Sequence, residues 1–193
     1  PIWNLALEWI ERFPSALRSV CRDGAWHPYC ISQRIGVWTK LYRFAPPPEP
    51  RRAAVLGSLA EQAEFLARRL ERDLGGNHLW ENARALFTAG CFFEGGPAER
   101  WRRLGRRWLR RCIDEQVSSA GEHFERSPMY QARLAAGLQE ASLLGRAVDP
   151  SFARRLLEHS QRMQEFHRGL LHPDGLPPLF GDTTLDEIGR AHV

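Results

Sequence analysis

Apolar residues recur at helical spacing along almost the whole chain, and no other feature limits the fold as strongly. The stretch 53–74 shows this best, because its leucines fall on one stripe while Glu61, Glu64 and Arg68 lie off it. Strict alternation of apolar and polar residues, which would indicate strands, is not convincing anywhere. The chain is therefore expected to be all-α. Further helices are predicted at about 3–20, around Trp38 and Leu41, and at about 78–90, 97–117, 128–145 and 150–171.

Glycine and proline clusters divide these helices. Gly75 and Gly76 are expected to end the helix that begins at 53, and the run Pro46 to Pro48 is expected to be an extended linker. Residues 172–182 read as a loop. Successive helices with short connections predict antiparallel helical hairpins. Such hairpins can close into a bundle, a solenoid or an incomplete (α/α) toroid, and periodicity does not choose among the three.

Composition narrows the class of protein and of partner. A chain of 193 residues is long enough for one domain with a core. Its net charge of +4 favours acidic partners, and the excess is almost all arginine, which binds carboxylate and sulfate groups in a fork. A GC-rich genome explains the same bias equally well. The four cysteines lack metal-ligand spacing, no apolar run has the length of a membrane span, and neither metal nor cofactor is expected.

One polar cluster follows Gly75 and Gly76. Asn77, His78 and Glu81 place amide, imidazole and carboxylate groups at the start of a helix, and His78 and Glu81, three residues apart, share a face. The simpler interpretation is structural: Asn77 caps the helix, or His78 and Glu81 form a capping pair.

A second candidate is Tyr130. Ser127 followed by Pro128 predicts a helix that starts there, with Tyr130 in its first turn. The positive end of the helix dipole, with Arg126 or Arg133 nearby, is expected to lower the pKa of the phenol and to suit it to proton transfer near neutral pH. The alternative is a half-buried tyrosine whose hydroxyl is simply hydrogen-bonded.

Three stretches together resemble the signatures of heparinase II/III-type proteins, in the order found in that family: Trp26–Ile35, Gly76–Ala83 and His123–Tyr130. The resemblance runs from about Trp3 to Asp182. It implies an (α/α) toroid, normally followed by a β-sandwich domain, and cleavage of uronate-containing acidic polysaccharides by β-elimination. It also implies export to the periplasm or secretion, although a cytoplasmic location is compatible with some relatives. On this basis residues 1–186 are expected to be part of the toroid domain, and residues 187–193 resemble a translated sequencing adapter.

The resemblance also assigns roles. Asn77 and His78 would neutralise the uronate carboxylate as the C5 proton leaves, and Tyr130 would donate a proton to the departing O4. Substrate contacts are expected from Glu81, Arg34, His123 and Glu125. Gln131 stands where the family often has histidine. A catalytic base usually comes from later sequence, so the chain alone is expected to be inactive.

Three alternatives to a lyase remain. The fold can serve as a non-catalytic scaffold that binds glycan or protein. A glycosidase would need two paired carboxylates, and Glu122, Glu125 and Asp182 are not paired by spacing. Nucleic-acid binding would use an arginine stripe, which we interpret instead as the solvated face of an amphipathic helix; its members are Arg102, Arg103, Arg106, Arg107, Arg110 and Arg111.

Overall fold

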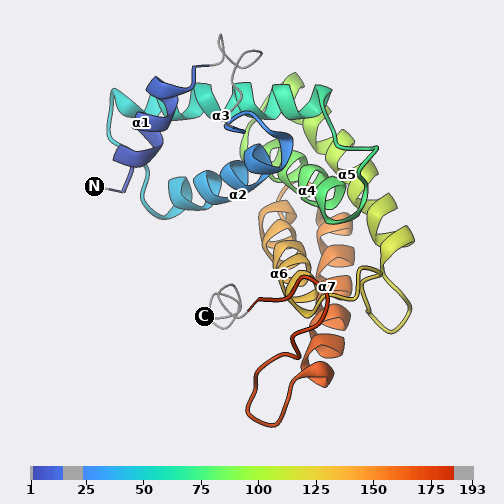
Figure 1. The fold of residues 1–193 in the computed structure, drawn as a ribbon. Helices are drawn as coiled ribbons and strands as arrows, with labels where there is room; N and C mark the ends of the chain where they lie inside the picture. The colour runs from blue at the N-terminus through green and yellow to red at the C-terminus, as the bar shows by residue number, and fades with distance from the viewer. Residues whose placement is uncertain (1, 15–23, 185–193) are drawn as a thin grey trace. The chain divides into compact units, whose positions relative to one another are not determined.

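The computed structural model describes residues 2–14 and 24–184. Within these ranges the chain forms seven α-helices and no strand, as Figure 1 shows. Their bounds are α1 Asn4–Arg12, α2 Pro28–Phe44, α3 Arg51–Arg68, α4 Gly76–Phe92, α5 Gly96–Gln116, α6 Pro128–Gly145 and α7 Pro150–Leu170.

The helices belong to two compact units. Unit 1 consists of Pro1–Arg72 and Glu81–Gly105, and unit 2 consists of Asp73–Trp80 and Arg106–Val193. The division falls inside α4 and inside α5, so that the first turn of α4 belongs to unit 2 and the remainder of that helix to unit 1. Among the described residues, no helix combines the length and the apolar character that a membrane crossing requires.

The core of unit 1 is built from the apolar stripes of α2 and α3. Ile31 and Ile35 on α2 and Leu66 on α3 are fully buried. Helix α2 has Pro28 at its first position and ends at Phe44, before the proline run, as expected, but it is much longer than the short helix predicted around Trp38. Helix α1 differs from the expectation as well, because it ends at Arg12 within the stretch of about 3–20 that was predicted to be helical. The later part of that stretch, residues 15–20, lies outside the described residues.

Helix α3 ends at Arg68, so the expectation that Gly75 and Gly76 end it is wrong. Polar contacts within unit 1 explain the early end. The backbone N–H of Glu71 donates to Asn82 Oδ1 at 2.9 Å, and its carboxylate accepts from Asn82 Nδ2 at 2.9 Å. These bonds hold the chain after Arg68 in a non-helical path. Leu74, which continues the apolar pattern, is consequently exposed, and Gly76 begins the next helix.

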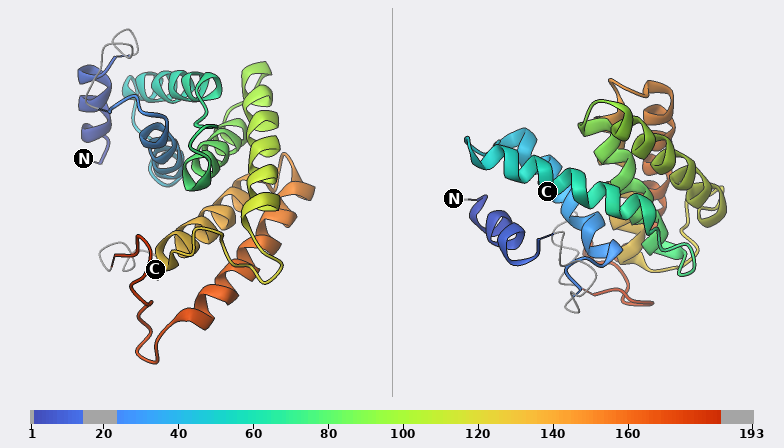
Figure 2. Two further views of the ribbon diagram at one scale, coloured as in Figure 1. Left: turned by 45° about the vertical axis from the view of Figure 1, so that its right-hand side comes forward. Right: turned by 90° about the horizontal axis from the view of Figure 1, so that it is seen from above.

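Two glycines let α4 and α5 approach closely within unit 1, and the helices lie side by side in both views of Figure 2 (green and yellow-green). A Cβ atom at Gly105 on α5 would lie 2.7 Å from the Ala83 carbonyl oxygen and 2.8 Å from Phe87 Cα. A Cβ atom at Gly90 on α4 would lie 2.6 Å from the Ala98 carbonyl oxygen. Real Cβ contacts essentially never fall below 3.0 Å, so both positions require glycine.

In unit 2, α6 and α7 form an antiparallel hairpin, drawn in orange in Figure 1. Its apolar interface includes Leu138 and Leu156, both fully buried, and Ser160 Oγ on α7 donates to the Ala135 carbonyl oxygen at 2.7 Å. Helix α6 has the bounds that the sequence predicts, and Ser127 is its N-cap residue as expected. Asp149 and Pro150 start α7 in the same manner.

Candidate active site

Asn77 lies in the first turn of α4, and its backbone is held by a carboxylate from a distant loop. The Asn77 N–H group donates to Glu125 Oε1 at 2.9 Å. The first N–H groups of a helix have no partner inside the helix, and a carboxylate there also interacts favourably with the helix dipole. Asn77 is the second residue of α4, so it is not the N-cap residue considered above. Glu125 caps this helix through the Asn77 backbone, and the side chain of Asn77, which is 9% exposed, takes no part in the cap.

Gly76 leaves room for this capping contact. A Cβ atom at Gly76 would collide with Glu125 Oε1, so any larger residue would displace the carboxylate. His78 follows Asn77 in the same turn and is half-buried. The first turn of α4 therefore carries adjacent amide and imidazole side chains, and the roles that the resemblance assigns to them stay predictions.

His123 supports the loop that carries Glu125. Its ring is fully buried, lies edge-on to Trp80 with centroids 5.6 Å apart, and has Nε2 3.1 Å from Gln116 Oε1. Burial lowers the pKa of His123 to about 4, so the ring is neutral at physiological pH. The expected contact of His123 with substrate does not fit this structure, because no part of its side chain is exposed.

Gln131 anchors the same loop. Its Oε1 accepts from the backbone N–H of His123 at 2.8 Å, and its Nε2 donates to the carbonyl oxygens of Gly121 and Met163 at 2.7 and 2.9 Å. The amide side chain thus uses donor and acceptor together to tie the loop to α7.

Tyr130 stands in the first turn of α6, with its backbone N–H 3.4 Å from Ser127 Oγ. Its hydroxyl donates to Asp182 Oδ2 at 3.5 Å, and its side chain is hydrogen-bonded to that of Asn77. The expected lowering of the Tyr130 pKa is wrong. Burial is the largest cause that raises this pKa, followed by the negative charge of Asp182, and Glu125 adds to both; the Asn77 hydrogen bond and Arg133 oppose them and do not prevail.

Unit 2 therefore brings together Asn77, Glu125 and Tyr130, which the sequence singled out, and Asp182, which it did not assign to this site. The signal for Asp182 was weak: it follows a loop rich in glycine and proline after the last helix, a place where site residues are common. Its pairing with Tyr130, 52 residues earlier, leaves no local pattern in the sequence.

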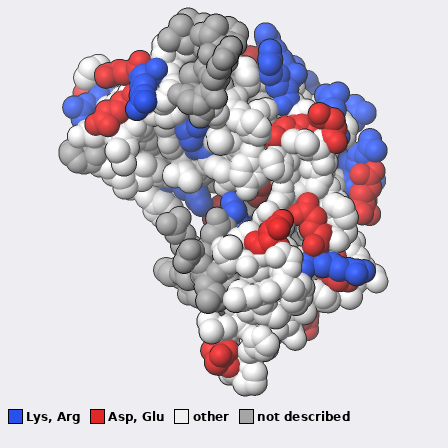
Figure 3. All heavy atoms as spheres, viewed as in Figure 1, with Lys and Arg blue, Asp and Glu red and all other residues white. Residues whose placement is uncertain are grey.

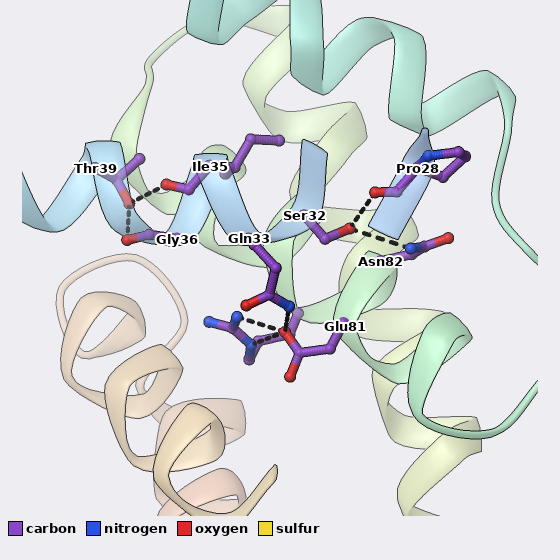
Figure 4. Close-up of polar contacts among 9 residues, drawn as sticks. Pro28, Ser32, Gln33, Ile35, Gly36, Thr39, Glu81 and Asn82 are labelled. Carbon is purple, nitrogen blue, oxygen red and sulfur yellow. Dashed lines mark hydrogen bonds and ion pairs between the residues drawn. The ribbon is translucent and has the colours of Figure 1, made fainter. Parts of the chain in front are cut away.

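Glu81 belongs to unit 1, where its carboxylate is buried and used internally. Glu81 Oε2 accepts from Gln33 Nε2 at 3.2 Å and pairs with Arg84 at 2.5 Å. Figure 4 shows Gln33 pointing from α2 toward Glu81 on α4. These contacts suit a residue that orients its protein neighbours, and they do not fit the contact with substrate expected of Glu81.

Arg34 is also held inside unit 1. Its Nε donates to Gln62 Oε1 at 2.9 Å, a terminal nitrogen donates to the Ala25 carbonyl oxygen, and the guanidinium lies 4.0 Å from the centroid of the Trp9 ring. Burial lowers the pKa of Arg34 to about 10. Nε and one terminal nitrogen of Arg34 are thus committed to protein groups, and the substrate contact expected of Arg34 stays a prediction.

The arginine stripe of α5 is balanced by acidic side chains. Arg103 pairs with Glu99 at 3.2 Å and Arg111 with Glu115 at 2.7 Å, each one helical turn apart. Arg106 pairs with Asp149 at 2.7 Å. Along the face where α5 lies, blue and red atoms alternate in Figure 3. This pattern is typical of the solvated face of a helix.

Comparison with known proteins identifies the family. The family described as "Heparinase II/III N-terminus" matches residues 3–191. The chain belongs to this family. A heparin-sulfate lyase of Bacteroides thetaiotaomicron is 32% identical over 145 residues, which are 72% of this chain and 20% of that protein. The heparin-sulfate lyase of Pedobacter heparinus is 26% identical over 187 residues, 93% of this chain and 28% of that protein.

Solved structures confirm the fold class. The crystal structure of heparinase III matches with a TM-score of 0.71 and 28% identity over 88% of this chain and 27% of that one. Heparan sulfate lyase HepC from Pedobacter heparinus matches with a TM-score of 0.66 and 24% identity, over 92% of this chain and 29% of that one, and supports the fold alone. The expected all-α, incomplete (α/α) toroid is thus confirmed. The chain spans less than a third of the length of each of these relatives.

Proposed function

We propose that the chain is part of a polysaccharide lyase that cleaves a uronate-containing acidic polysaccharide by β-elimination. The relatives named heparin-sulfate lyases support the reaction class. The observation that carries the proposal for this chain is that the side chains of Asn77 and Tyr130 lie close enough to interact, although they come from the first turns of two different helices. An amide donor beside a phenol supplies two groups that the elimination requires.

The proposed reaction removes the C5 proton of the uronate and breaks the bond between C4 and O4. A base takes the proton, the electron pair of the C5–H bond forms the C4–C5 double bond, and the pair of the C4–O4 bond leaves with O4. Asn77 and His78 would donate to the uronate carboxylate, where negative charge builds up. Tyr130 would protonate O4. Its raised pKa keeps the phenol protonated at neutral pH, which suits a proton donor. The base is expected from another part of the complete protein.

The test uses the complete protein that contains this sequence, incubated with heparan sulfate, alginate and other polyuronates. Elimination is measured as the rise in ultraviolet absorbance of the unsaturated uronate. Tyr130→Phe is expected to lower kcat by roughly 100-fold or more, because general acid catalysis contributes about that much. Tyr42→Phe is the matched control, since Tyr42 lies on α2 in unit 1 against Phe92 and is expected to retain activity.

Two results would contradict the proposal. Full activity in Tyr130→Phe would exclude this tyrosine as the proton donor. A complete protein that binds polyuronates but gives no absorbance change would instead favour the non-catalytic glycan-binding scaffold.

A further inference from the structure

Four consecutive residues, Gly181–Thr184, dock onto the start of α6; we call them the strap. Thr183 Oγ1 lies 3.1 Å from Ser127 Oγ and accepts from the Met129 N–H at 3.3 Å. The Thr184 hydroxyl donates to Met129 Sδ at 3.8 Å. The strap thus meets the N-cap residue and the first turn of α6 through more than one side chain.

Gly181 makes this close docking possible. Its φ of 61° lies in the left-handed region, which glycine adopts without strain, and it sits so near α6 that an added Cβ would be 3.4 Å from the Arg126 carbonyl oxygen and from Ser127 Cα. The tight backbone turn at Gly181 and the two hydroxyl contacts of Thr183 fix the residue between them, which is Asp182.

The position of Asp182 is therefore set by its neighbours Gly181 and Thr183. Thr183 acts as a second cap from outside the helix, because Met129 N–H is one of the first amides of α6 and has no partner within it. With Thr183 fixed there, Asp182 Oδ2 reaches the Tyr130 hydroxyl at 3.5 Å. A carboxylate so close to the phenol can accept its proton in a hydrogen bond and opposes its ionisation.

We propose that Asp182 is a positioning residue that holds the Tyr130 hydroxyl group by accepting its hydrogen bond, and that the strap exists to place this carboxylate. The proposal rests on the proposed function for its catalytic meaning, since it assigns the carboxylate to the proposed proton donor. The contact that keeps Tyr130 protonated can be measured from the ionisation of Tyr130, without any reaction.

The first experiment follows the ionisation of Tyr130 in the 193-residue chain. The three tyrosines are labelled with ¹³C at Cζ, and the Tyr130 signal is assigned by its loss in Tyr130→Phe. Asp182→Asn is expected to lower the pKa of Tyr130, because it removes a negative charge beside the phenol. Asp174→Asn is the control: it makes the same change of charge in the same loop, where Asp174 accepts from the Leu176 N–H, and is expected to leave the Tyr130 titration in place.

A second pair of variants tests the strap itself. Thr183→Val removes the hydroxyl that contacts Ser127 and Met129, so Asp182 loses its anchor and the pKa of Tyr130 is expected to fall in the same direction. Thr183→Ser keeps the hydroxyl and is expected to restore the wild-type value. Equal titration midpoints for Tyr130 in wild type, Asp182→Asn and Thr183→Val would overturn the proposal, provided that circular dichroism shows all three folded. If Asp182→Asn unfolds, Asp182→Glu replaces it in the comparison. This variant keeps the negative charge, so the Tyr130 pKa is expected to be higher in Asp182→Glu than in Thr183→Val.

Activity of the complete protein distinguishes this proposal from the proposed function. Tyr130 acts as a donor while protonated, so Asp182→Asn is expected to move the alkaline limb of the kcat profile to lower pH. If the complete protein is inactive but Asp182→Asn lowers the pKa of Tyr130 as expected, the proposed function is overturned and the contact between Asp182 and Tyr130 is supported. If the protein is active but Asp182→Asn changes neither the titration of Tyr130 nor the pH profile of kcat, only the role of Asp182 is overturned.

Discussion

Several residues of the stretch 121–131 act on the site through their neighbours. Glu125 holds the backbone of Asn77, His123 fixes the loop that presents Glu125, and Gln131 ties that loop to α7. The resemblance to the family implied that Glu125 and His123 contact the substrate. The sequence could not show where these side chains point. The His123 ring is buried against Trp80 and Gln116, which lie on helices α4 and α5.

The buried His123 predicts a pH-dependent stability. Its folded pKa of about 4 lies below the unfolded value of 6.5, so between these values the unfolded chain binds a proton that the folded chain does not. This contribution is therefore complete above pH 6.5 and is lost as the pH falls toward 4. We expect the free energy of unfolding to drop by up to roughly 3 kcal/mol over this window from His123 alone.

Urea denaturation at pH 7, 5.5 and 4 measures this effect. His123→Phe keeps an aromatic ring beside Trp80 and is expected to flatten the pH dependence. His159→Asn is the comparison: burial is the main cause that lowers the pKa of His159 also, but its ring is half-buried, so a smaller flattening is expected. An unchanged slope in His123→Phe would show that the buried imidazole is not the group that titrates.

At the scale of the helices, prediction succeeded where the start and stop signals are local. Helix α6 has its predicted bounds, because Ser127 and Pro128 specify its start whatever surrounds them. Helix α3 does not have its predicted bounds, because its end depends on Asn82, which lies on the next helix. The predicted lowering of the Tyr130 pKa was wrong for the same reason. The helix start was visible in the sequence, whereas the burial of Tyr130 and the approach of Asp182 were not.

The close packing of α4 and α5 predicts opposite results for two glycine substitutions. Gly105→Ala would drive a Cβ into the backbone of α4, and we expect it to lower the free energy of unfolding by about 2 kcal/mol or more. Gly57→Ala on α3, where nothing lies within 4 Å, is the control and is expected to raise it by roughly 0.5 to 1 kcal/mol. Thermal and urea unfolding of both variants check this, and a stabilising Gly105→Ala would contradict the packing described.

Across the whole molecule, the proposed substrate contacts divide between the two units. Asn77 and Tyr130, whose side chains contact each other, lie in unit 2, whereas Arg34 and Glu81 lie in unit 1 with their own internal partners. Three motifs in the sequence indicated the family and its fold class. The same motifs assigned substrate contacts to residues of both units without distinguishing them. They could not do otherwise, because a motif gives residue types and does not reveal which donors are already used.

This division predicts a difference in binding. Asn77→Ala is expected to weaken binding of a polyuronate oligosaccharide by about 10- to 150-fold, since a hydrogen bond to a charged group contributes roughly 1.5 to 3 kcal/mol. Arg34→Ala is expected to leave the affinity unchanged and to lower stability by about 2 kcal/mol, because it removes bonds to Gln62 and Ala25 and the stacking on Trp9. Calorimetric titration and urea unfolding of the complete protein measure both, and weaker binding in Arg34→Ala at equal folding would restore its expected substrate role.

The contact between Asn77 N–H and Glu125 joins residues 48 apart in sequence, and this has a kinetic consequence. A contact over such a separation forms after the local turns of the helices, since the intervening chain must first be closed into a loop. During synthesis, the first turn of α4 therefore stays without its cap until Glu125 has left the ribosome, long after the rest of α4 has emerged. The turn that bears Asn77 therefore becomes ordered later than the rest of α4.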